Sequence, residues 1–272
     1  MEIGYCLRTS IFPFFSFNST ITKTLNLLIT SLPINHPVTF YSYITMEIME
    51  FLDENRLNQR ISEWGADIFG FADLGEVQTT EFSHLPAAIS IGVHLSDQII
   101  RGIKNGPTIL YAYNVSTANS LLNEIALKTS NYVQNSGFDA VPIPAAQSSR
   151  KSTIQFQHKT AATCAGLGWI GKSSLLVNPQ YGPRLRLVTV LTDAPITTFG
   201  EPVRESRCGT CKSCLGVCPV GAIKDTNWKV GMDVHEYFDL ERCQEYIDKE
   251  GLLLDKPVCG ICISACSIGL QK

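Results

Sequence analysis

The chain has 272 residues, of which 44% are hydrophobic and 17% charged, and its formal net charge is −3. This composition excludes a low-complexity or intrinsically disordered chain and leaves enough apolar material for a core. The small negative charge provides no overall positive field for nucleic acid. No run of residues approaches the roughly 20 consecutive apolar positions of a membrane span, so we expect no membrane segment.

The predicted elements begin after a leader of unusual composition. Residues 1–45 contain one acidic and two basic side chains, and we expect them to be a disordered extension or an over-long start assignment, outside the fold. From Met46 to Trp64, apolar residues recur at helical spacing, and Gly65 follows. Further elements are predicted in chain order: strands at 67–72 and 87–93, a long helix at 114–134, and strands at 138–144 and 185–192.

The order of elements predicts two domains. Strands and helices mix over residues 46–200, which indicates an α/β or α+β domain that binds a cofactor. The polar residues 197–207 are the expected linker. Residues 201–272 are then predicted to form a small ferredoxin-like domain with two clusters.

Eight of the ten cysteines lie in this last part of the chain, beginning with Cys208-x2-Cys211-x2-Cys214-x3-Cys218-Pro219. The run matches the bacterial ferredoxin pattern for [4Fe–4S] ligation, in which the fourth cysteine serves the other cluster. The remaining cysteines are Cys243, Cys259, Cys262 and Cys266. We therefore expect two [4Fe–4S] clusters with interleaved ligands. The expected ligand sets are Cys208, Cys211, Cys214 and Cys266 for one cluster and Cys218, Cys243, Cys259 and Cys262 for the other.

Structural zinc and a disulfide framework account for the cysteines less well. Structural zinc uses Cys-x2-Cys pairs, which do not explain a triple run followed by Cys-Pro. A disulfide framework suits secreted chains of fewer than about 100 residues. Thiolate ligation instead indicates a reducing, cytoplasmic setting. Outside the run, Cys6 and Cys164 are expected to be small buried hydrophobic residues.

The segment Gly166–Ser173 (Gly-Leu-Gly-Trp-Ile-Gly-Lys-Ser) satisfies two phosphate-binding patterns, the dinucleotide fingerprint and the P-loop. Both patterns require a strand before the glycines and a helix after them. Residues 158–165 look helical instead, and Pro179 follows too soon for a helix of ordinary length. A P-loop ATPase with a ferredoxin module is therefore the least favoured interpretation.

Residues 158–162 (His-Lys-Thr-Ala-Ala), the glycine-rich segment and the eight cysteines together resemble the epoxyqueuosine reductase family, which is related to reductive dehalogenases. The resemblance covers about residues 50–272. It implies a corrinoid-binding domain whose cobalamin receives electrons from the clusters and reduces an epoxide on a tRNA wobble nucleoside. It also implies that the cofactor site is lined by Gly166, Leu167, Gly168, Trp169, Gly171 and Lys172.

The chain departs from that family in ways that argue against tRNA as its substrate. Family enzymes have an acidic residue after a Tyr-Ala pair, whereas Tyr111-Ala112 is followed by Tyr113-Asn114. The helical repeat domain that helps the family to hold tRNA is not expected here. His158 is a candidate proton donor in place of the missing acid, although a lone histidine beside a loop is more often structural. The arginines at 184, 186, 204 and 207 are expected on a solvated, ion-paired surface.

Together these patterns predict a cytoplasmic iron–sulfur oxidoreductase. Electrons would come from an external donor, which would be a ferredoxin, a flavodoxin or a reductase, and would pass through the clusters to a cobalamin or a substrate. The alternative is a ferredoxin-type electron carrier without a substrate site of its own.

Overall fold

The computed structural model describes residues 52–75, 82–146, 156–254 and 256–270. The expected extension at 1–45 and the first part of the helix expected from Met46 lie outside the described residues. The chain from Leu52 onward forms one compact unit, and the domain boundary expected near residue 200 stays a prediction. No helix in these ranges is long and apolar enough to span a bilayer.

Helices and strands are interspersed up to residue 192, and only helices are assigned after it in the described ranges. In chain order they are α3 (Glu54–Glu63), β1 (Ile68–Asp73), β2 (Ala87–His94), α4 (Asp97–Arg101), α5 (Ile109–Asn135), β3 (Ala140–Ile143), α6 (His158–Cys164), β4 (Trp169–Ile170), β5 (Leu176–Val177), β6 (Leu185–Thr192), α7 (Ser213–Val217), α8 (Val234–Tyr237), α9 (Leu240–Leu254) and α10 (Ile261–Ser264).

The main sheet has four strands in the order β1-β2-β6-β3, and each neighbouring pair is antiparallel. The two central strands pair along their full lengths, from Ala87 opposite Thr192 to His94 opposite Leu185. Of the two fold classes expected from the sequence, this topology is α+β, because α/β folds are built on parallel strands.

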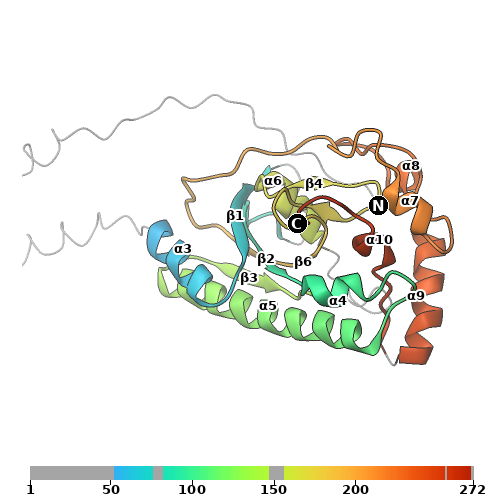
Figure 1. Cartoon of the computed structure of the whole chain (residues 1–272). Coiled ribbons are helices and arrows are strands. Elements are labelled where there is room, and N and C mark those ends of the chain that lie inside the picture. The colour runs from blue at the N-terminus through green and yellow to red at the C-terminus, as the bar shows by residue number, and fades with distance from the viewer. Residues whose placement is uncertain (1–51, 76–81, 147–155, 255, 271–272) are drawn as a thin grey trace, which may run out of the picture. The chain divides into compact units, whose positions relative to one another are not determined.

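Helices cover both faces of this sheet (Figure 1). On one face, Ile89 and Val190 pack in the same core as Leu122 and Ile125 of α5. On the other face, Leu191 packs in a smaller core with α6. Successive side chains of a strand point to opposite faces, so the apolar runs in β2 and β6 have every residue covered. The mixed character expected for this region is confirmed.

The helix α5 begins five residues before its predicted start at Asn114. Thr108 caps it, since its hydroxyl accepts a hydrogen bond from the Tyr111 amide at 3.2 Å. Its first turn presents Ile109 and Leu110, whose side chains are 58% and 63% exposed. Because these exposed apolar residues interrupt the helical spacing of buried ones, the start predicted from the sequence lies after the start seen in the structure.

The last quarter of the described chain contains the short helices α7, α8 and α10 and the 15-residue helix α9, and no strand is among the elements assigned there. Isolated bridges join Glu205 to Lys229 and Ile223 to Phe238. Trp228 and Tyr237 are almost completely buried, and they pack with Ile170 beside several of the cysteines. The helical loops therefore have a small core of their own, which also holds one end of the glycine-rich segment.

The expected linker is anchored by Glu54, the first residue of α3. The buried carboxylate of Glu54 accepts hydrogen bonds from the Thr197 amide at 2.6 Å and from the Thr197 hydroxyl at 2.7 Å. The amide of Thr198, at 3.2 Å, and the hydroxyl of Thr198 donate to the other carboxylate oxygen. One side chain thus satisfies four donors of a segment that has no secondary structure.

We predict that Glu54→Ala lowers the free energy of unfolding by about 2 kcal/mol, because it leaves several donors without an acceptor. Urea unfolding measures the change. Glu63→Ala on the same helix is the matched control, since Glu63 forms exposed contacts, an ion pair with Arg60 and a hydrogen bond from Gln59, and its effect should stay within about 0.5 kcal/mol. Equal effects of the two substitutions would contradict this role for Glu54.

Candidate functional site

The structure gathers a first group of four thiols from Cys208, Cys211, Cys214 and Cys266. Burial raises the pKa of Cys214 to about 11, and the thiols of Cys208, Cys266 and Cys211 add to the rise. Burial also raises the pKa of Cys266, on which Cys208 and Cys211 act as well. Thiols raise one another's pKa only when they are close enough for their charges to repel. These four residues therefore surround one volume.

A second group is formed by Cys218, Cys243, Cys259 and Cys262. Burial raises the pKa of Cys243 to about 11, and Cys259 and Cys218 add to the rise. Burial likewise raises the pKa of Cys262, on which Cys259, Cys243, Cys214 and Cys218 also act. Since Cys214 belongs to the first group, the two groups adjoin. The two ligand sets that the cysteine spacing predicts, and their ligation of clusters, stay predictions.

The chemistry of the two groups fits [4Fe–4S] clusters. All the cysteines in the described ranges are free thiols. Within those ranges, no three His, Cys, Asp or Glu side chains are placed to share one metal ion. A single zinc gathers its sulfurs around one point, whereas each thiolate of a cubane binds its own iron and stands farther from the others. The Ala222 amide donates to Cys218 Sγ at 3.3 Å, which is the kind of hydrogen bond that tunes cluster potentials.

The glycine-rich segment lies between α6 and the β4–β5 hairpin. A helix therefore precedes it and a two-stranded hairpin follows it, which is the reverse of what a P-loop requires. Lys172 is only 2% exposed, and its Nζ lies 2.6 Å from Asp225 Oδ1. The same amine donates to the Cys211 carbonyl at 3.0 Å. Its amine is already paired, so the phosphate-binding interpretation loses its support.

Gly166 and Gly168 are required by contacts within the protein. A Cβ on Gly168 would lie 2.3 Å from the Val177 carbonyl oxygen, and one on Gly166 would lie 2.8 Å from the Glu201 carbonyl oxygen. Gly171 faces the first thiol group, because a Cβ there would lie 3.6 Å from Cys208 Sγ. The segment thus packs directly against the cysteine loops. That it also lines a corrinoid site stays a prediction.

Trp169 is the residue of this segment with an unsatisfied polar atom. Its side chain is 5% exposed, and its buried Nε1 has no hydrogen-bond partner within the described part of the protein. The guanidinium of Arg207 lies 5.7 Å from its ring centroid. Leu167, two residues earlier, packs against the small core around α6. A buried donor without a partner is the expected sign of a group that binds there.

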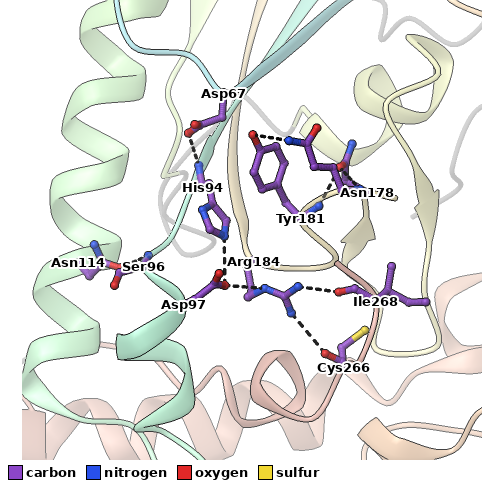
Figure 2. Close-up of polar contacts among 11 residues, drawn as sticks. Asp67, His94, Ser96, Asp97, Asn114, Asn178, Tyr181, Arg184, Cys266 and Ile268 are labelled. Carbon is purple, nitrogen blue, oxygen red and sulfur yellow. Dashed lines mark hydrogen bonds and ion pairs between the residues drawn. The ribbon is translucent and has the colours of Figure 1, made fainter. Parts of the chain in front are cut away.

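Arg184 joins the sheet to the last cysteine, and this role was missed from the sequence (Figure 2). The expectation that Arg184 lies on a solvated surface is wrong, because its side chain is fully buried. Its Nη1 donates to the Cys266 carbonyl at 3.3 Å and its Nη2 to the Ile268 carbonyl at 2.6 Å. Its Nε lies 3.0 Å from Asp97 Oδ1. These contacts cross more than 80 residues, and no local pattern signals them.

His94 extends this network on the other side of Asp97 (Figure 2). Its Nε2 lies 3.3 Å from Asp97 Oδ1, and its ring centroid is 4.7 Å from that of Tyr181. Its backbone amide donates to Asp67 Oδ2 at 2.7 Å. Four segments of the chain are thereby tied together beside the first thiol group.

His158 lies where both ring nitrogens have partners. Its Nε2 is 2.9 Å from the Pro144 carbonyl, which only accepts, and its Nδ1 is 2.9 Å from the Thr189 hydroxyl. Nε2 therefore carries the proton, and Nδ1 accepts from the hydroxyl. Burial lowers the pKa of His158 to about 4, although the hydrogen bond to Pro144 opposes this. These contacts favour a structural role over the predicted proton donor.

The next residue, Lys159, was not singled out from the sequence. Its Nζ donates to the Ser174 carbonyl at 2.7 Å and lies 3.3 Å from the Ser174 hydroxyl. Burial lowers the pKa of Lys159 to about 8. Ser174 itself has a positive φ of 59°, a conformation uncommon outside glycine. Lys159 thus supports the turn that follows Lys172.

Tyr111 and Asn114 lie at the start of α5, where the resemblance found in the sequence implies an acidic residue. Tyr111 is buried, and its hydroxyl lies close to Gly260, where a Cβ would be 2.5 Å from it. Asn114 Oδ1 accepts a hydrogen bond from the Ser96 amide at 3.3 Å. The start of α5 is therefore held against the second thiol group, with an amide rather than a carboxylate at position 114.

Comparison of sequences finds relatives among reductases. The chain is 26% identical over 226 residues to a tetrachloroethene reductive dehalogenase of Desulfitobacterium hafniense, covering 78% of this chain and 38% of the relative. Over 107 residues it is 34% identical to the epoxyqueuosine reductase of Cyclobacterium marinum, covering 39% and 34%. It is 37% identical over 107 residues to that of Escherichia coli K12, covering 38% and 25%. The chain thus spans between a quarter and two-fifths of these relatives, and no family model matches it.

Solved structures with the same fold come from the same two groups. One is a reductive dehalogenase described with a mechanism for B12-dependent dehalogenation, with a TM-score of 0.58 at 20% identity over 78% of this chain and 32% of that one. Another is an epoxyqueuosine reductase with an epoxyqueuosine-modified tRNA stem loop, with a TM-score of 0.55 at 16% identity over 79% and 65%. At such identities the likeness concerns the fold.

The fold and the relatives define a class of reductases whose members share this sheet and helix arrangement. Within that class, the chain is similar in sequence to epoxyqueuosine reductases and shares its fold with solved members of that group.

We predict that His158 makes the stability of the protein depend on pH. Its pKa of about 4 in the folded state is below the ordinary 6.5, so the unfolded chain binds the proton more readily. The free energy of unfolding should therefore fall as the pH drops from about 6.5 toward 4, and recover above 6.5. Urea unfolding between pH 5 and 7 measures this slope, which His158→Gln should reduce. The same slope in both proteins would contradict a buried, neutral His158.

Proposed function

We propose that the chain is an iron–sulfur oxidoreductase that carries electrons through two [4Fe–4S] clusters to a site beside the glycine-rich segment. One observation supports this above all: two adjoining groups of four free thiols, most of them partly buried, lie in a chain whose relatives are reductases. The first cluster would be held by Cys208, Cys211, Cys214 and Cys266. The second would be held by Cys218, Cys243, Cys259 and Cys262. When bound, such clusters supply one-electron transfer.

In this proposal, the cysteine loops form the ferredoxin-like part of the protein. Their own residues place the two sets of ligands side by side, since Cys214 of one set acts on Cys262 of the other. Gly171 keeps the glycine-rich segment against Cys208. Adjoining clusters would suit electron transfer from one end of the site to the other.

We propose that a corrinoid of the cobalamin type occupies the site next to Trp169. The partnerless Nε1 of Trp169 supports this, as does the fold shared with a dehalogenase described as B12-dependent. Trp169 would present its flat face or its N–H to the cofactor, with Arg207 behind the ring. The flanking Gly166, Leu167 and Gly168 would keep the segment close to the protein.

The substrate of this chain is proposed to differ from the tRNA bound by a related reductase. Asn114 stands near the place of the family's acid, and an amide has no acidic proton to give at neutral pH. The net charge of −3 also lacks the positive excess that nucleic acid binding requires. The electron donor would be an external ferredoxin, flavodoxin or reductase. Free thiols and clusters suit the reducing cytoplasm.

A second candidate function is an electron carrier that holds both clusters but has no cofactor or substrate site. The paired amine of Lys172 and the internal contacts of Gly166 and Gly168 favour it, since these residues already have a packing role.

We predict about eight irons per chain after anaerobic purification and reconstitution. Cys243→Ala, on α9, should reduce this to about four, because it removes a ligand of the second cluster only. Iron and sulfide analysis measures both values. Cys164→Ala is the matched control, since Cys164 is buried in α6 outside both groups, and it should leave the iron content unchanged. A chain without iron would rule out the proposed function.

For the corrinoid, we predict that the protein retains hydroxocobalamin through gel filtration and that Trp169→Leu retains at least tenfold less. Absorbance of the protein fraction measures retention. Full iron content without retained corrinoid would favour the carrier function instead.

A further inference from the structure

Two buried cations contact the main chain of the first thiol group. Lys172 donates to the carbonyl of Cys211, and Arg184 donates to the carbonyl of Cys266. Their side chains are 2% and 1% exposed, respectively. A fully buried cation is costly unless it is paired, and each of these has one carboxylate partner.

Those partners are open to solvent, unlike the cations. Asp225, which pairs with Lys172, has a side chain that is 40% exposed. Asp97, which pairs with Arg184, is 33% exposed. Water screens an exposed charge far more than a buried one. Asp225 is in addition shared with a second cation, Lys212, at 2.5 Å. Water therefore weakens the negative charge of each aspartate more than the positive charge of its buried partner. The net electrostatic field that each pair exerts on the sulfurs is positive.

The second thiol group lacks such contacts. In the described part of the chain, no lysine or arginine side chain donates a hydrogen bond to Cys218, Cys243, Cys259 or Cys262. Both thiol groups accept hydrogen bonds from backbone amides, Cys218 from Ala222 and Cys266 from Ile268. Hydrogen bonds to sulfur therefore do not distinguish the two groups. The difference between the groups is one of charge.

We propose that Lys172 and Arg184 are positioning residues that give the first cluster a higher reduction potential than the second. This inference rests on the proposed function. A nearby positive charge stabilises the reduced cluster, which has one more negative charge than the oxidised one. An electron that enters the protein therefore rests at the first group. That group lies against Gly171, so reducing equivalents collect beside the glycine-rich segment.

The test is an EPR-monitored redox titration of the reconstituted protein. Lys172→Met removes the buried charge, and we expect the reduction equilibrium of one cluster to become about tenfold less favourable, which is about 59 mV for one electron. Asp225→Asn removes the opposing charge, and we expect a shift of the same cluster toward higher potential. Structural damage alone would not produce shifts of opposite sign.

Three further variants test whether the shift in potential belongs to the first cluster and depends on the charge of these side chains. In the Cys243→Ala background, which should keep only the first cluster, the shift caused by Lys172→Met should persist. Arg184→Met should lower the same potential, and Arg184→Lys should restore most of it by restoring the charge. Lys128→Met is the matched control, because Lys128 pairs with Glu124 on the exposed side of α5, and it should move neither potential.

The inference is overturned if Lys172→Met shifts both clusters equally, shifts only the second, or leaves both unchanged. It is also overturned if Asp225→Asn moves the potential in the same direction as Lys172→Met. A protein that binds no iron would instead remove the proposed function itself, and the iron analysis above separates that result from a failure of the charge effect alone.

Discussion

The arrangement of the cysteine loops depends on two positively charged side chains that are buried beside the first thiol group. Lys172 and Arg184 are removed from water although both are ionised, and the contacts that compensate them come from cysteine loops distant in sequence. Each cation therefore fastens a loop to the sheet domain: Lys172 from the hairpin turn, and Arg184 from the residue before β6. Without these pairs the loops would lose the fixed geometry that two adjoining groups of thiols require.

Much of the architecture was predictable because it is encoded locally. The strand predicted at 185–192 is β6 with the same bounds, since a run of apolar, β-branched residues covered on both faces has a strong pattern. The composition of the two proposed ligand sets also comes from spacing, and it stays a prediction. The arginine and lysine contacts were not predictable, because Lys172 and Asp225 are 53 positions apart and Arg184 and Ile268 are 84 positions apart, and such contacts leave no periodic signal.

The glycine-rich segment shows that the same sequence pattern can occur in different structures. Gly166 and Gly168 stand where a phosphate-binding loop would have them, yet they allow close approach to Glu201 and Val177 of the same chain. His158 is similar, because a residue type suited to proton transfer is held here between a carbonyl and a hydroxyl. Only the contacts of these residues distinguish phosphate binding or proton transfer from a packing role. Those contacts come from residues that are distant in sequence.

The interleaving of the thiol groups has a consequence for biogenesis. The first group takes Cys266 from beyond every member of the second, and the second takes Cys218 from the end of the first run. The first proposed ligand set is therefore complete only when residue 266, the last cysteine of the sequence, has been synthesised. The second set is complete four residues earlier, at Cys262, so the proposed clusters would become able to form in the reverse of the order in which their first ligands appear.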